Sequence, residues 1–388
     1  MKNEHHAQHQ LLFLSIALLS AGGGMYNYFK LSPLMPSIIE DLGLTYGLTG
    51  LLVGSFGLFQ LILSIPIGLI VHKQNLKKAI TFALILMILG ALISGVAPDL
   101  YLLFAGRVIE GAGAALALVT TPLLVAVVSV KKKVWFGLGV LMIFMPIGNI
   151  LGLTVTSWFL KMFGWRNAWL TGVIMPALAL PLILSWTKPI EKVRGIVGET
   201  NTAVKLKGLK GLLLGLLQMS FSTTSMGFVM WAPTYMIESY SFDVSIASLS
   251  ASLFMVMGIP APIIGAWLSD KVGSKKTILA LSFGVLTLIY PLTTLIPSHL
   301  LPLHILAAGF LSGMVSAVIY LCAVDLLGPS SNIGFGILNA GRGFSMFFGP
   351  LLLGTILNTT SSWALSFASL SLFAFLALVS SLLLLRIR

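Results

Sequence analysis

Long runs of apolar residues alternate with short polar stretches along the whole chain. A helix needs roughly 20 apolar residues to cross the hydrocarbon core of a bilayer. Runs of at least this length lie at about residues 11–38, 46–71, 77–97, 100–129, 134–160, 165–186, 211–238, 244–269, 276–296, 301–326, 332–357 and 361–385. The pattern predicts an all-α integral membrane protein with twelve transmembrane helices.

The longest polar stretch divides these predicted helices into two groups of six. We predict an N-terminal six-helix bundle at residues 1–186, a cytoplasmic linker at 187–210 and a C-terminal six-helix bundle at 211–388. A shift of 198 residues places His72 on Asp270 and Trp165 on Trp363, so the two halves are repeats. A duplicated six-helix unit is one of the repeat plans of secondary transporters, whose substrate site lies near the membrane midplane.

Composition excludes a water-soluble fold. Hydrophobic residues make up 57% of the chain and charged residues 9%, against roughly 45–50% and about 25% in soluble proteins. The net charge of +12 needs no nucleic-acid partner, because the basic residues follow a membrane topology. With the N-terminus placed in the cytoplasm, eighteen of the 23 Lys and Arg fall in cytoplasmic stretches and two, Lys161 and Arg166, in outer loops. This positive-inside bias predicts an inner-membrane protein with both termini in the cytoplasm.

Three local motifs resemble signatures of the major facilitator superfamily, and the resemblance covers essentially the whole chain. The segment Leu268-Ser269-Asp270-Lys271-Val272-Gly273-Ser274-Lys275-Lys276 is similar to its cytoplasmic loop signature. The corresponding loop in the first half has His72 in place of the acid. Arg107-x-x-x-Gly111-x-Gly113 resembles the fourth-helix signature, and Gly164-Trp165-Arg166 resembles the entry to the sixth helix. The resemblance implies two pseudo-symmetric six-helix bundles that transport a solute by alternating access.

The cytoplasmic loop of the second half is a candidate gate. Asp270 lies at a predicted helix end beside Lys271 and near Gly273, where an acid can form a latch with neighbouring lysines. His72 occupies the equivalent position in the first half. Since histidine titrates near neutrality, His72 is either a pH-sensitive gating residue or an ordinary solvated side chain.

Lys30 is one of four ionisable residues that fall inside the predicted spans. Such residues are costly in a bilayer, so each is a functional hypothesis. Lys30 shares a helical face with Asn27 and Tyr26, three and four residues earlier. The resemblance implies that the first helix lines a central cavity, where these three residues would bind substrate. The alternative is that Lys30 extends toward the outer surface.

Arg342 is the second buried cation and lies deep in the predicted eleventh helix, one turn from Asn339. A guanidinium in this position favours an anionic ligand. Its alternative role is structural, capping carbonyls or meeting Asp325. With Tyr235 of the seventh helix, the predicted substrate-binding residues are Lys30, Arg342, Asn27, Tyr26, Asn339 and Tyr235.

Arg107 and Glu110 are three residues apart on the predicted fourth helix, so they can neutralise each other. The functional alternative makes Glu110 a protonatable group that couples proton and substrate movement. The four intramembrane residues carry a surplus of two positive charges, which favours a small organic or inorganic anion as substrate. We expect proton symport or anion exchange by a monomer, with no cofactor or metal.

Two competing functions remain. Proton-coupled efflux of drugs or amphipathic compounds would need Glu110 as an acid exposed to the cavity, while a non-transporting membrane protein is disfavoured by the repeat and the short loops. The chain has no phosphate-binding Gly-Lys-Ser loop and no His-Glu-x-x-His or Gly-x-Ser-x-Gly motif. Because these motifs carry nucleotide and hydrolase chemistry, we do not expect an enzyme.

Overall fold

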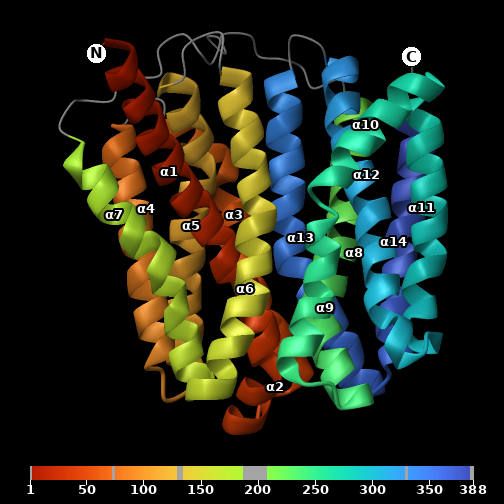
Figure 1. Cartoon of the computed structure of the whole chain (residues 1–388). Helices are drawn as coiled ribbons and strands as arrows, with labels where there is room; N and C mark the ends of the chain where they lie inside the picture. The colour runs from red at the N-terminus through yellow and green to blue at the C-terminus, as the bar shows by residue number, and fades with distance from the viewer. Residues whose placement is uncertain (1, 72–74, 129–133, 187–207, 328–330, 385–388) are drawn as a thin grey trace. The chain divides into compact units, whose positions relative to one another are not determined.

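The structure, a computed structural model, describes residues 2–71, 75–128, 134–186, 208–327 and 331–384. All regular secondary structure in these residues is helical (Figure 1). The predicted all-α fold is therefore confirmed. The chain divides into two compact units, residues 1–34 with 62–203, and residues 35–61 with 204–388.

The first unit is built around α1, which packs against α5, α6 and α7, while α4 packs against α5 and α7 (Figure 1). Its elements are α1 (Lys2–Phe29), α4 (Leu76–Gly95), α5 (Leu100–Val128), α6 (Val134–Leu170), the 3-10 turn η1 (Thr171–Val173) and α7 (Ile174–Ser185). Two further helices, α2 (Leu31–Leu42) and α3 (Tyr46–Val71), each contribute residues to both units.

The second unit is organised around α8, which packs against α9, α13 and α14. Its helices are α8 (Gly208–Tyr240), α9 (Val244–Val256), α10 (Pro260–Val272), α11 (Lys275–Leu292), α12 (Leu301–Leu327), α13 (Ser331–Thr360) and α14 (Trp363–Leu384), with short turns η2 (Thr293–Leu295) and η3 (Ser298–Leu300). The units differ from the predicted bundles, 1–186 and 211–388, because residues 35–61 pack with the second unit.

Glycine explains why the first part of α3 packs so closely on α13. A Cβ at Gly57 would lie 2.7 Å from Met346 Cβ, and one at Gly54 would overlap the Phe347 carbonyl oxygen. Real Cβ atoms do not approach neighbours this closely, so only glycine permits the crossing. Small residues that let backbones approach are a common device for helix association in membranes.

The helices correspond to the predicted membrane spans. Within the described residues, ten helical stretches are long and apolar enough to cross a bilayer, and Tyr46–Ile62 is a shorter apolar helix. One of the ten, Pro146–Ser185, holds two predicted spans, which Gly164 separates by a non-helical backbone with φ 76°. Glycine adopts this left-handed region without a steric penalty. Large apolar side chains such as Phe82 and Leu295 are exposed, as expected for surfaces that face lipid.

The predicted duplication is visible in the helix bounds. In the first half α2 ends at Leu42 and α3 begins at Tyr46, while α8 ends at Tyr240 and α9 begins at Val244. The turns between them also match, since Gly43 has φ 60° and Ser241 has φ 54°. These pairs have the 198-residue spacing that the sequence repeat predicts.

Glycine also sets the distance between α4 and α5, the helix that carries Arg107 and Glu110. A Cβ at Gly113 would lie 2.6 Å from the Ala83 carbonyl oxygen, and one at Gly90 would overlap the backbone nitrogen of Glu110. The glycines therefore let α5 approach α4 backbone to backbone. This contact gives a structural reason for Gly113 in the fourth-helix motif.

We predict that Gly113→Leu lowers the thermal unfolding midpoint of the detergent-purified protein, because forced overpacking costs roughly 1–3 kcal/mol. Gly284→Leu in α11 is the matched control, since a Cβ at Gly284 would meet nothing within 4 Å. Equal midpoints for the two variants would contradict the close packing of α4 on α5.

Candidate functional site

The first predicted span, residues 11–38, is interrupted in the structure at Lys30. α1 ends at Phe29 and α2 begins at Leu31. Pro33 explains the break, because proline has no backbone N–H to donate to the carbonyl of Phe29 and its ring clashes with that carbonyl. Discontinuous helices are found where transporters bind their substrates and ions.

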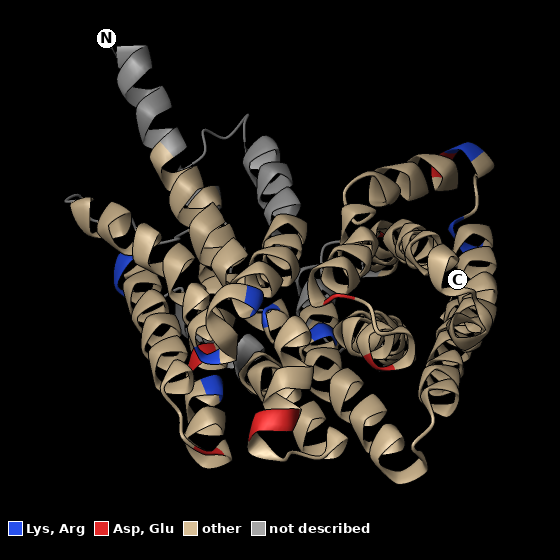
Figure 2. Ribbon diagram, turned by 60° about the horizontal axis from the view of Figure 1, so that its bottom comes forward, with Lys and Arg blue, Asp and Glu red and all other residues tan. Residues whose placement is uncertain are grey.

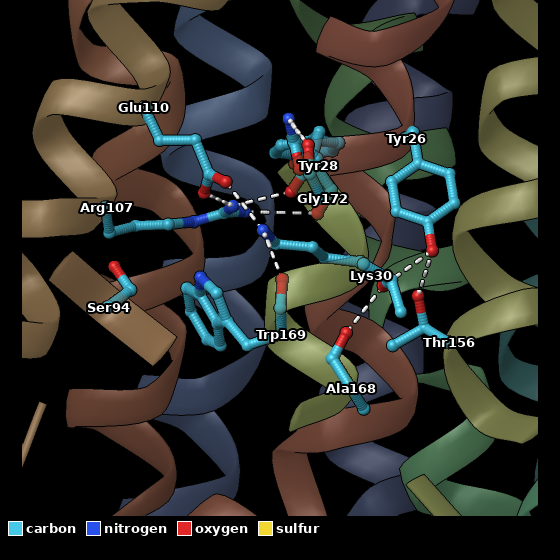
Figure 3. A network of polar contacts seen from close by, with 12 residues as sticks. Tyr26, Tyr28, Lys30, Ser94, Arg107, Glu110, Thr156, Ala168, Trp169 and Gly172 are labelled. Carbon is cyan, nitrogen blue, oxygen red and sulfur yellow. Dashed lines mark hydrogen bonds and ion pairs between the residues drawn. The ribbon is translucent and has the colours of Figure 1, made fainter. Parts of the chain in front are cut away.

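Lys30 is fully buried at this break and faces α5 and α6 (Figure 3). Its Nζ forms an ion pair with Glu110 Oε1 at 2.6 Å and donates to the Trp169 carbonyl oxygen at 3.1 Å. The same nitrogen lies 5.0 Å from the centroid of the Trp169 ring, within the range of a cation–π interaction. Lys30 therefore does not extend to the outer surface, and that alternative is wrong for this structure.

Arg107 joins the same cluster from α5 and connects it to the end of α1 (Figure 3). Its guanidinium donates to Glu110 Oε2 at 2.9 Å, to the Asn27 carbonyl at 2.5 Å and to the Tyr28 carbonyl at 3.1 Å. The last carbonyls of a helix lack intrahelical partners, and a cation near them is favourable. Arg107 thus satisfies carbonyls of the last turn of α1 as well as Glu110.

Asn27 and Tyr26 are held beside the cluster by hydrogen bonds to the fifth and sixth spans. Asn27 Nδ2 donates to the Gly172 carbonyl at 3.1 Å. The Tyr26 hydroxyl donates to Thr171 Oγ1 at 2.7 Å and lies 3.1 Å from Thr156 Oγ1. A Cβ at Gly172 would overlap both Asn27 Oδ1 and Lys30 Nζ, so the absence of a side chain there leaves room for these two groups.

The structure brings five of the predicted site residues together in the first unit, namely Lys30, Asn27, Tyr26, Arg107 and Glu110. The pairing of Arg107 with Glu110 agrees with its structural interpretation. Trp169 is a member of the site that the sequence analysis missed. No charge or motif marks this tryptophan, and its only signal is its position one helical turn after Trp165.

The other predicted substrate-binding residues lie in the second unit. Arg342 is partly buried and Asn339 is exposed, both on α13. Tyr235 is buried on α8, where its hydroxyl lies 3.3 Å from that of Tyr240 and its ring 5.4 Å from Trp363.

The residues of the candidate gate lie at and after the end of α10. Asp270 and Lys271 are exposed at the end of α10, and Lys271 Nζ lies 4.9 Å from the Trp267 ring centroid. Gly273 caps α10 in the left-handed conformation, with φ 66°. The ion pair at this loop joins Lys275 to Asp325 of α12, where the sequence predicted Asp270 as the acid. His72 lies outside the described residues.

Charge is scarce along the described helices, as the few blue and red segments in Figure 2 show. In the described part of the chain, the buried charged side chains are Lys30, Arg107 and Glu110, each 0% exposed. The cluster therefore carries one surplus positive charge. No group of three His, Cys, Asp or Glu that could hold a metal ion occurs among the described residues.

Comparisons with known proteins agree with this architecture. The sequence model of the Major Facilitator Superfamily matches residues 12–332 and again 214–388. The nitrite extrusion protein of Bacillus subtilis (strain 168) is 24% identical over 380 residues, which cover 96% of this chain and 92% of that protein. A probable nitrate transporter, NarT, of Staphylococcus epidermidis is 23% identical over 374 residues, which cover 95% and 94%.

A solved structure shares the fold. A bacterial homologue of the human lysosomal transporter Spinster, in an inward-facing and occupied conformation, superposes with a TM-score of 0.84. The two sequences are 13% identical, and the match covers 97% of each chain.

We predict that Glu110→Gln destabilises the protein more than Lys30→Met. The first substitution leaves Lys30 and Arg107 buried without their carboxylate, and removing one partner of a buried pair costs about 3–5 kcal/mol. Lys30→Met leaves the ion pair of Arg107 and Glu110, which has no net charge, intact. Thermal unfolding of the two purified variants measures the difference, and a lower midpoint for Lys30→Met would contradict the shared role of Glu110.

Proposed function

Because this multi-pass membrane protein belongs to the Major Facilitator Superfamily, we propose that it is a secondary active transporter of a small anion that works by alternating access. Relatives named as a nitrite extrusion protein and a probable nitrate transporter support this substrate class. The proposed localisation is the inner membrane, with both termini in the cytoplasm, because the basic residues are concentrated in one set of loops.

The observation that carries this proposal is the surplus positive charge of the buried cluster. Lys30 and Arg107 share the single carboxylate of Glu110 in an interior where each of the three side chains is 0% exposed. Charge–charge interactions are strong in such a low-dielectric environment. A bound anion would bring the cluster to neutrality, whereas a bound cation would increase its charge.

The ion pairs also supply a mechanism. An anion that enters the site takes the place of the Glu110 carboxylate beside Lys30 and Arg107. If Glu110 is then protonated, one proton moves with each anion, which is symport. If it stays ionised and re-forms its ion pairs after the anion leaves, the transporter exchanges one anion for another. Asn27 and Tyr26 provide neighbouring polar groups in both cases.

We also propose that Arg342 and Asn339 on α13, with Tyr235 on α8, bind the anion. Their side chains can each donate a hydrogen bond. Arg107 and Glu110 are the proposed coupling residues. Asp270, Lys271 and Gly273 are proposed to gate the cytoplasmic side together with His72, and the substrate and the lipid bilayer are the proposed partners of a monomer.

The efflux alternative is less well supported by the same contacts. Export of lipophilic cations requires an acid that a cationic solute can reach. Each oxygen of Glu110 is occupied by a cation of the protein. A cationic solute would have to compete with both Lys30 and Arg107 for this carboxylate.

We expect proteoliposomes that contain the purified protein to take up nitrate or nitrite by counterflow, and Lys30→Ala and Arg342→Ala to lower this uptake at least tenfold. The reason is that each variant loses a charge-assisted hydrogen bond, which is worth about 1.5–3 kcal/mol. In vesicles loaded without anion, an internal pH-sensitive dye separates the mechanisms, because symport then brings in a proton with each anion and acidifies the lumen, whereas exchange needs an internal anion and does not acidify it.

The control is a set of vesicles offered a sugar and a lipophilic cation under the same conditions. Normal anion uptake by both variants, at matched reconstitution levels, would exclude the proposed site. Uptake of the lipophilic cation alone would replace the anion proposal with efflux.

A further inference from the structure

The indole N–H of Trp169 is a buried donor without an acceptor. Trp169 is 0% exposed, and its Nε1 has no hydrogen-bond partner. The N–H of a buried tryptophan usually finds a partner, and an unsatisfied buried polar group costs free energy that the fold must offset. A donor in this state requires an explanation.

The surroundings of the ring indicate what the missing acceptor is. Lys30 Nζ lies 5.0 Å and Arg107 Cζ 5.7 Å from the ring centroid, so the two cations of the cluster lie against this one side chain (Figure 3). The Trp169 backbone carbonyl is already occupied by Lys30. The ring therefore adds one more donor to a place where two cations already attract negative charge.

We propose that Trp169 is a substrate-contacting residue whose indole N–H donates to the transported anion. This inference rests on the anion transport proposed above. When the anion replaces the Glu110 carboxylate beside Lys30 and Arg107, it supplies the acceptor that the indole lacks. The aromatic face stays beside the cations, while the indole N–H adds one more directional donor for the anion.

Asn27 Oδ1 is also buried without a hydrogen-bond partner, but it is an acceptor, whereas the indole N–H is a donor. It lies beside the Lys30 ammonium, because a Cβ added at Gly172 would overlap both groups. An ammonium has three donors, and two of those of Lys30 go to Glu110 and to the Trp169 carbonyl. The third can satisfy Asn27 Oδ1 within the protein, whereas the indole donor needs an added acceptor.

The test removes the N–H and keeps the ring. Trp169 is replaced by β-(3-benzothienyl)alanine, whose sulfur takes the place of the N–H in a ring of similar size, and separately by phenylalanine. Binding of nitrate and nitrite to the purified full-length protein is measured by titration, and the unfolding midpoint is measured without anion. Trp158, which is 54% exposed on α6, receives the same two replacements as a matched control.

We expect the isostere at position 169 to weaken anion binding about tenfold or more, as the loss of a hydrogen bond to a charged group predicts. Its midpoint without anion should equal or exceed that of the wild type, because an unsatisfied donor has been removed. The replacements at Trp158 should change neither quantity.

Two results would overturn the inference in different ways. If the wild type binds the anions and the isostere binds them equally well, the indole N–H does not contact the substrate. If the isostere instead lowers the midpoint without changing affinity, the N–H serves the anion-free fold. Failure of the wild type itself to bind or transport any anion would remove the proposed function, and is recognised without reference to the variants.

Discussion

The carboxylate of Glu110 is the interaction on which the interior of the first unit depends. It is shared by Lys30 at 2.6 Å and Arg107 at 2.9 Å, and all three side chains are removed from solvent. Two cations this close together in a low-dielectric interior repel each other unless an anion lies between them. Because Arg107 also binds the Asn27 and Tyr28 carbonyls, the same carboxylate helps to fix where α1 ends.

The position of this cluster along the chain connects it to the rest of the fold. The chain passes from the first unit to the second between Leu34 and Met35, a few residues after Lys30, and returns between Leu61 and Ile62 inside α3. Residues 35–61, which include most of α2 and the first part of α3, therefore follow the helix break and belong to the second unit.

Close helix packing makes so buried a charge cluster possible. Lipid is as apolar as the helix surfaces, so helices in a membrane associate by packing and hydrogen bonding with little hydrophobic driving force. Glycine supplies that packing in both units, at Gly113 between α5 and α4 and at Gly57 between α3 and α13. Gly172 serves the site directly, since its missing side chain leaves room for Asn27 and Lys30.

The sequence by itself determined the membrane spans and their duplication, because hydrophobic length and a 198-residue repeat each act within one helix or one repeat. The i, i+3 spacing of Arg107 and Glu110 allowed their pairing but left a functional alternative open, and the structure shows the pair. Only the tertiary structure decided that Lys30 joins that pair, that Trp169 lies against both cations, and that Lys275 pairs with Asp325. Lys30 is 80 positions from Glu110 and 139 positions from Trp169, so these residues meet only when helices pack. The side chains at each helix crossing decide which helix faces are in contact. The interruption of the first span at Lys30 was predictable only in part. Pro33 is visible in the sequence, but an apolar run does not indicate whether a proline will bend the helix or end it.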